Sequence, residues 1–269
     1  MVVDGINSMI LFVIQMIKCQ FKMQRKMKCL LVGLFALLSI AIDAQMPEGM
    51  ITYNRKTDWA SINAKLPYVS SEEADRRRLV SSGWENKGTD YELSFKDNTS
   101  IYQKKETDDN NGWRRSKLVL IRDYNKKTKK DLREDVGTEM LIEDDIEKTK
   151  WKILNEIKEV AGYLCMKAET TNAIKDQTIY AWFTDAIPFS GGPEGFGGLP
   201  GMILELDIND GDAVTYATNV DLKTPIEKLP IPKKMKGKKM DQAKYDGIIK
   251  KFIEESIEGR KNPYWRIRF

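Results

Sequence analysis

Carboxylates are the side chains whose types and spacing come closest to a reactive site, because the sequence contains no histidine. Without histidine the chain lacks the commonest general base, the Ser-His and Cys-His nucleophilic pairs, and the commonest ligand of zinc and copper. A hydrolase that works with two carboxylates needs them to converge across a cleft. Closely spaced carboxylates occur at Asp108–Asp109, at Asp144–Asp145 and at Asp207, Asp210 and Asp212. We predict no catalytic residue, and a carboxylate-dependent hydrolase or a metal-binding protein stays the alternative to a non-enzymatic protein.

Neither a metal site nor a cofactor is predicted. The turn Asp207–Asp212 has the composition of a calcium loop but lacks the full alternation of ligands and the closing glutamate, so a hairpin turn is favoured. Cys165 lies between Leu164 and Met166 in a strand-like run. This position favours a buried side chain over a nucleophile or a soft-metal ligand.

A glycine- and proline-rich stretch, Gly191–Gly201, runs directly into the apolar segment Met202–Ile208. Glycines permit positive φ angles and prolines fix φ at about −65°, so the stretch is a restrained turn. No Lys-Ser or Lys-Thr pair follows Gly201, which argues against a phosphate-binding loop. We assign a candidate binding site to seven residues on this loop and on the strand before it: Trp182, Pro193, Phe196, Gly198, Leu199, Pro200 and Gly201.

Two interpretations of this loop stay open. In the favoured one it is structural, with Gly198 and Gly201 meeting backbone constraints around Pro200. In the other it is a recognition loop, in which exposed Phe196 and Leu199 contact a partner.

The hexapeptide Gly198–Ile203 resembles the motif that names the GLPGLI family, with Met202 where that family usually has leucine. The resemblance covers most of the chain after residue 44. It implies an exported Bacteroidota protein whose biochemical role is unsettled. Further matching segments are Gly162–Ala168, Ala181–Thr184 and Ile187–Pro188, and more loosely Gly49–Tyr53 and Tyr91–Phe95.

Residues 29–42 form an apolar run that follows a cluster of basic residues. At about 14 residues this run is too short to span a bilayer comfortably. Together with Ala44 before Gln45 it predicts a Sec signal peptide, residues 1–44, cleaved near Ala44. The internal Met23 and Met27 leave open that residues 1–22 are an over-long start. We expect a periplasmic or secreted protein with no integral membrane segment in the mature chain.

Removal of residues 1–44 takes most of the net positive charge with it. The whole chain carries a formal charge of +4, whereas residues 45–269 hold 39 Lys and Arg against 38 Asp and Glu. A near-neutral domain lacks the field that would hold a phosphate backbone, so nucleic acid is not an expected partner. One cysteine remains after residue 44, which excludes an internal disulfide.

Alternating apolar residues separated by short polar turns predict about ten strands, joined as successive hairpins. The fold class is α+β, mainly β: one curved antiparallel sheet, a half-barrel-like meander with a C-terminal covering helix. That helix is expected from about Asp241 to Glu258, and a weaker one over Ser71–Val80. The sheet domain covers 45–222, and residues 223–269 add a Pro- and Lys-rich connector, the helix and an aromatic end. The expected strands are 50–59, 91–95, 100–104, 117–124, 131–136, 151–153, 163–171, 178–184, 202–208 and 214–222.

The combined pattern favours a non-enzymatic binding or envelope-assembly protein. Trp182 and Phe196 are the expected contributors to the concave face of the sheet, where they would either fill the core or line an apolar cleft. The expected partner is an envelope protein or an apolar ligand, which the sequence does not identify further.

Overall fold

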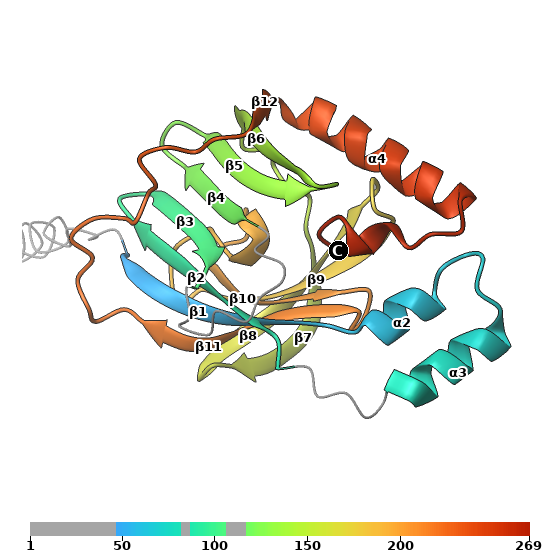
Figure 1. Cartoon of the computed structure of the whole chain (residues 1–269). Helices are drawn as coiled ribbons and strands as arrows, with labels where there is room; N and C mark the ends of the chain where they lie inside the picture. The colour runs from blue at the N-terminus through green and yellow to red at the C-terminus, as the bar shows by residue number, and fades with distance from the viewer. Residues whose placement is uncertain (1–46, 82–86, 106–116) are drawn as a thin grey trace, which may run out of the picture. The chain divides into compact units, whose positions relative to one another are not determined.

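The computed structural model describes residues 47–81, 87–105 and 117–269, so the predicted signal peptide lies outside the described residues. Within them, twelve strands form one open, curled sheet (Figure 1). The strands are β1 (Gly49–Thr57), β2 (Thr89–Lys96), β3 (Thr99–Lys104), β4 (Leu118–Asp123), β5 (Thr128–Asp135), β6 (Thr138–Asp145), β7 (Lys152–Val160), β8 (Tyr163–Asn172), β9 (Gln177–Thr184), β10 (Met202–Ile208), β11 (Ala213–Asp221) and β12 (Lys238–Met240).

The order of strands in the sheet is β12-β6-β5-β4-β3-β2-β1-β11-β10-β9-β8-β7. Strands β2 to β6 follow one another as hairpins on one side of β1, and β7 to β11 do so on the other side. Pairing of β1 with β11 joins the two halves, with Tyr53 opposite Ala217. Strands β6 and β7, although consecutive in sequence, lie far apart in the strand order, so the sheet curls without closing.

The predicted curved antiparallel sheet is confirmed, with two strands that the pattern did not reveal. Strand β6 was missed because charged residues flank its three buried positions, Met140, Leu141 and Ile142. Strand β12 was missed because it is short and lysine-rich, and it pairs with β6 in parallel. The parallel pair makes the sheet mixed at this edge only.

Helix α4 (Gln242–Glu258) lies within the range predicted for the C-terminal helix. Asp241 caps it, since its carboxylate accepts a hydrogen bond from the backbone N–H of Lys244 at 2.8 Å. Its buried residues Tyr245, Ile249 and Ile253 pack in one cluster with residues of β6, as the predicted covering role requires.

Two further helices, α2 (Trp59–Ala64) and α3 (Ser71–Ser81), form the connection from β1 toward β2. The sequence predicted α3 but assigned Trp59 to the end of a strand. Asp58 explains the difference, because its side chain accepts from the backbone N–H of Ser61 at 2.9 Å and begins α2.

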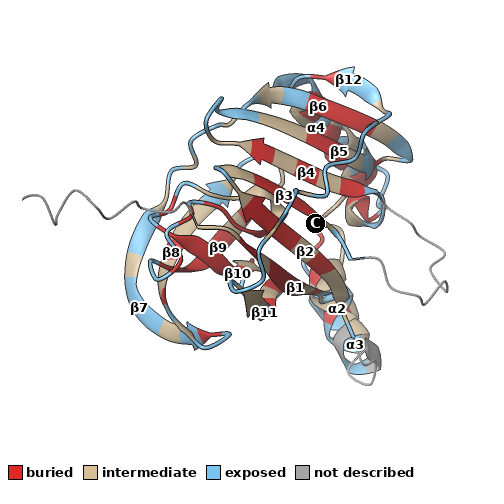
Figure 2. Ribbon diagram, turned by 90° about the vertical axis from the view of Figure 1, so that its left-hand side faces the viewer, coloured by how far each residue is buried: buried red, intermediate tan, exposed pale blue. Residues whose placement is uncertain are grey.

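Burial is uneven across the sheet (Figure 2). The central strands β1 and β2 bury large side chains such as Tyr53 and Phe95, both 0 % exposed, whereas the edge strand β7 is exposed along most of its length. Ile153 and Ile157 of β7 stand 57 % and 61 % exposed. Within the described residues, no helix has both the length and the apolar composition needed to cross a membrane.

Candidate functional site

The glycine-rich loop lies between β9 and β10, and its middle forms a single 3₁₀ turn, η1 (Pro193–Gly195), that contacts β3, β4 and β10. In Figure 1 this turn lies between the strands of the two halves of the sheet. The loop therefore fills space inside the curled sheet, and the concave face predicted as either a core or a cleft is occupied there by the chain itself.

The seven predicted site residues do not share one open surface. Trp182 is 8 % exposed, with the ammonium of Lys158 4.3 Å from its ring centroid, and Leu199 is 3 % exposed. Pro193 is buried at the start of η1, and Phe196 is half-buried with its ring 6.1 Å from that of Trp151. Of the three remaining positions, Gly198 and Pro200 are exposed and Gly201 is buried.

Both glycines of the structural interpretation have positive φ, +90° at Gly198 and +144° at Gly201. A Cβ on Gly201 would lie 2.0 Å from the main-chain oxygen of Thr184, so any larger residue would displace the backbone. Ser190 adds to the restraint, because its hydroxyl donates to the carbonyl of Leu199 and accepts from the N–H of Gly198. These contacts support the structural interpretation, and a recognition role for the loop stays a prediction.

Sequence reasoning missed Glu194, which is the charged centre of this loop. It has a left-handed backbone, φ +58°, and its carboxylate forms a two-pronged ion pair with Arg268 near the C-terminal end of the sequence, 2.5 Å at each oxygen. The hydroxyl of Tyr102 also donates to it at 3.1 Å. Burial alone would raise the pKa of Glu194, but Arg268 and Arg55 outweigh burial and lower it to about 2.

Further ion pairs extend from this centre through the interior. Arg122 of β4 pairs with Asp131 of β5, which also accepts from Arg133 at 3.2 Å. Asp135 accepts from the hydroxyl of Tyr245 on α4 and from the backbone N–H of Arg268, at 2.8 and 2.9 Å. Arginine–carboxylate pairs of this kind fix the position of one element against another.

The signal for this network was present in the sequence but not specific. Arg266 and Arg268 alternate with aromatic and aliphatic residues in the last segment, and a lone glutamate interrupts an otherwise apolar motif. Only the fold shows that the two sets of charges meet.

Of the carboxylates that were candidates for chemistry, Asp108 and Asp109 lie outside the described residues, whereas Asp144, Asp207 and Asp212 have structural partners. Asp212 is buried and accepts hydrogen bonds from Ser61 and from the ammonium of Lys65, each at 2.7 Å, so it ties the β10–β11 turn to α2. Asp207 accepts from the N–H of Gly211 within the same turn, as the hairpin interpretation expects. Among the described residues, no group of three His, Cys, Asp or Glu side chains is placed to hold a metal ion.

Cys165 is fully buried, and burial raises the pKa of its thiol to about 11. A thiol with so high a pKa is a poor nucleophile at neutral pH, which agrees with the buried side chain expected from the sequence.

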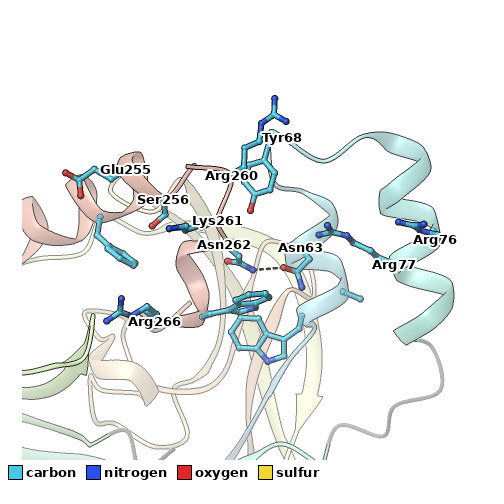
Figure 3. Close-up of a pocket in the computed structure, with 14 residues that line it drawn as sticks. Asn63, Tyr68, Arg76, Arg77, Glu255, Ser256, Arg260, Lys261, Asn262 and Arg266 are labelled. Carbon is cyan, nitrogen blue, oxygen red and sulfur yellow. Dashed lines mark hydrogen bonds between the residues drawn. The ribbon is translucent and has the colours of Figure 1, made fainter. Parts of the chain in front are cut away.

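A cavity of about 1140 Å³ opens elsewhere, between the α2–α3 pair and the segment from the last turns of α4 to η2 (Pro263–Trp265) (Figure 3). Two tryptophans stand at its wall, Trp59 at 41 % exposure and Trp265 at 56 %. A hydrogen bond of 2.6 Å from the side chain of Asn262 to that of Asn63 joins the two walls. The lining residues are Trp59, Ala60, Asn63, Tyr68, Arg76, Arg77, Phe252, Glu255, Ser256, Arg260, Lys261, Asn262, Trp265 and Arg266.

None of these residues was predicted from the sequence to form a site. They come from two regions nearly 200 positions apart, and their types, aromatic and basic, are ordinary for exposed helices and turns. Trp59 fell at the end of the strand expected over 50–59, and Trp265 fell in the aromatic end of residues 223–269.

Comparison with known proteins identifies the family of the chain and similar folds. Residues 92–247, more than half of the chain, match the family model described as N-glycanase peptide, N-terminal domain. Two solved structures of PNGF-II, in the P21 and C2 space groups, match with a TM-score of 0.51 and 15 % sequence identity, which supports a likeness of fold alone. The matches cover 75 % of this chain, and this chain spans about a third of theirs, 33 % and 32 %. No curated protein matches the chain.

Proposed function

The chain belongs to the family of N-glycanase peptide N-terminal domains, and from that premise we propose that it is an exported, non-enzymatic protein that binds a glycan-bearing ligand. The observation that carries the proposal is the cavity beside α2 and α3, with Trp59 and Trp265 in its wall. Exposed indole rings give the apolar C–H face of a sugar ring a flat surface on which to pack, and neighbouring polar groups can bind its hydroxyls.

The family name suggests the class of ligand, and the cavity is the site at which we propose that it binds. The family is named for N-glycanases, so N-linked glycans are the ligand class that its name suggests. All fourteen residues that line the cavity lie outside the matched range 92–247. The match therefore describes the scaffold, whereas the cavity is built by the segments on either side of it.

The non-enzymatic part of the proposal rests on the chemistry of the available groups. The chain has no histidine, the thiol of Cys165 is buried, and the clustered carboxylates Asp207 and Asp212 hold a turn. The interior carboxylates Asp131 and Glu194 are paired with arginines, which keep them ionised and occupied. A carboxylate-dependent hydrolase stays the alternative, and the test below includes it.

We also propose that the protein is exported. Two features support export: the signal-like segment of residues 1–44 and the resemblance of Gly198–Ile203 to the GLPGLI motif. Intact mass of the protein recovered from cells checks it. A mature chain that begins at Gln45 agrees with export, and an uncleaved chain contradicts it.

The binding test compares an N-glycopeptide with the same peptide after its glycan has been removed, using calorimetry on the purified protein. We expect the glycopeptide to bind and the bare peptide not to bind. Trp59→Ala should weaken binding by about tenfold or more, since a stacked aromatic side chain is worth roughly 1–3 kcal/mol when buried by a ligand. Leu164→Ala is the matched control, because Leu164 is 70 % exposed and does not line the cavity.

Equal binding of the two peptides would overturn the proposal. Mass spectrometry of the glycopeptide after incubation decides the enzymatic alternative, because loss of the glycan, or its shortening, would show a hydrolase. An unchanged glycopeptide that is bound through Trp59 supports the non-enzymatic role.

Envelope assembly is the second candidate, and the edge of the sheet at β7 favours it. Ile153, Ile157 and Leu164 are all more than half exposed, and β7 pairs on one side only. An unpaired strand with exposed apolar side chains is a surface on which another protein can add a strand. A photo-crosslinker at Ile157 that captures one defined envelope protein in the source cell would support this role. The same crosslinker at Asn219 is the control. Capture of no protein at Ile157, or of the same protein at both positions, would oppose the role.

A further inference from the structure

The cavity beside α2 and α3 carries an excess of positive charge that sugar binding by itself does not require. Five of its fourteen lining residues are basic and one, Glu255, is acidic. The basic residues come from three segments: Arg76 and Arg77 from α3, Arg260 and Lys261 from the turn after α4, and Arg266 from the end of η2. The excess contrasts with the near-neutral balance of residues 45–269.

Part of this charge is already compensated and part is not. Arg77 pairs with Glu73 at 2.5 Å. The acidic Glu255 pairs at 3.6 Å with Lys251, a residue that does not line the cavity. Arg266 donates to a neutral acceptor, the carbonyl of Val136. In the part of the chain that the structure describes, Arg76, Arg260 and Lys261 form no ion pair.

The turn that presents two of these residues has an unusual backbone. Arg260 has φ of +51°, in the left-handed region that non-glycine residues seldom adopt. The turn is held by hydrogen bonds from the N–H of Arg260 to Ile257 and from the N–H of Lys261 to Ser256. Figure 3 shows Arg260 and Lys261 on the α4 side of the cavity and Arg76 and Arg77 on the α3 side.

On these grounds, and resting on the proposed function, we infer that the cavity selects an acidic saccharide, a sugar that carries a carboxylate or a sulfate. The planar guanidinium of arginine matches the geometry of such groups and can donate two parallel hydrogen bonds to one of them. The tryptophans contact the sugar ring, and Arg76 and Arg260 contact its acidic group. A neutral sugar would leave those guanidinium groups unpaired.

The test uses two matched pairs of probes at physiological salt. The first pair is a sialylated N-glycopeptide and the same glycopeptide after removal of sialic acid. The second is a sulfated oligosaccharide and its desulfated form. We expect the acidic member of at least one pair to bind about tenfold more tightly than its neutral partner, and the preference to shrink as salt is raised. Which pair shows the preference identifies the carboxylate or the sulfate as the recognised group.

Variants assign the preference to the cavity. The double variant Arg76→Gln/Arg260→Gln should lower binding of the acidic probe to the level of the neutral one. Lys250→Gln is the matched control, because Lys250 is 62 % exposed on α4, does not line the cavity and carries the same charge. Far-ultraviolet circular dichroism and melting temperature of each variant confirm that it is folded.

The outcomes separate this inference from the proposed function. Equal binding of acidic and neutral glycopeptides overturns the inference and leaves the glycan-binding proposal standing. A preference that survives in the double variant also overturns it. Binding of neither glycopeptide above the bare peptide removes both. A single-stranded oligonucleotide of equal charge that binds as tightly as the acidic sugar would show a general anion surface and overturn the saccharide assignment.

Discussion

Arg268 and Glu194 form a two-pronged ion pair that joins the segment next to the C-terminal end of the sequence to the glycine-rich loop, 74 residues apart in sequence. Their side chains are 15 % and 8 % exposed, so the pair is largely shielded from water. Arg268 also donates a hydrogen bond to the hydroxyl of Tyr91, and Glu194 accepts one from the hydroxyl of Tyr102. The pair fixes the loop inside the curled sheet.

Replacing Glu194 by glutamine should destabilise the protein by about 3–5 kcal/mol, because it leaves Arg268 and Arg55 buried beside an uncharged partner. Chemical denaturation measures the change. Glu254→Gln is the control, since Glu254 and Lys250 form an exposed pair at 4.0 Å that should contribute less than about 0.5 kcal/mol. Equal effects of the two variants would show that the interior pair does not stabilise the fold.

Acid should remove the contribution of Glu194 in a defined range of pH. Its pKa falls from 4.5 to about 2 on folding, so the stabilisation is complete above the unfolded value and is lost as pH falls toward 2. The wild-type protein should therefore lose more stability than Glu194→Gln between those two values. Unfolding free energies of both proteins across this range provide the check, and parallel curves would contradict the assignment.

Lys175 should make the stability of the protein depend on pH in the alkaline range. Burial, with Arg133 nearby, lowers the pKa of its ammonium from 10.5 to about 8, while the ammonium donates to the carbonyl of Arg268. Between these two values the unfolded chain binds more protons, so this group makes stability rise with pH. Lys175→Met should abolish that rise relative to the wild type. The difference between the two stability curves from pH 8 to 10.5 is the measurement, because tyrosine titration is common to both.

Gly201→Val should destabilise the protein by at least about 3 kcal/mol, since a Cβ meets the carbonyl of Thr184 and the φ angle is unfavourable. Leu199→Ser should cost about 2–4 kcal/mol through loss of a buried side chain. Gly247→Ala is the control. It lies in α4 with open space around it, and there alanine should raise the free energy of unfolding by about 0.5–1 kcal/mol. Unchanged melting of Gly201→Val and Leu199→Ser would favour the recognition loop instead.

Local patterns determined the elements of this fold. The apolar spacing of Tyr245, Ile249 and Ile253, with Asp241 before and Gly259 after them, predicted α4 because a helix needs only its own face and caps. Alternating apolar residues and short turns predicted most of the antiparallel sheet, because hairpin strands also pair with their neighbours along the chain. Strand β6 escaped because its buried centre is only three residues long between charged ends.

The tertiary structure alone decided where the charges and the cavity lie. Glu194 meets Arg268 because the curled sheet brings a loop and a distant segment into one interior, and a charged residue carries no periodic signal that names its partner. Trp59 and Trp265 likewise face one cavity although 206 positions separate them. The sequence by itself determined most of the strands and helices, because these depend on neighbours along the chain. The site depends on neighbours in space, because only the fold brings α2 and α3 beside the end of α4 and η2 around one cavity.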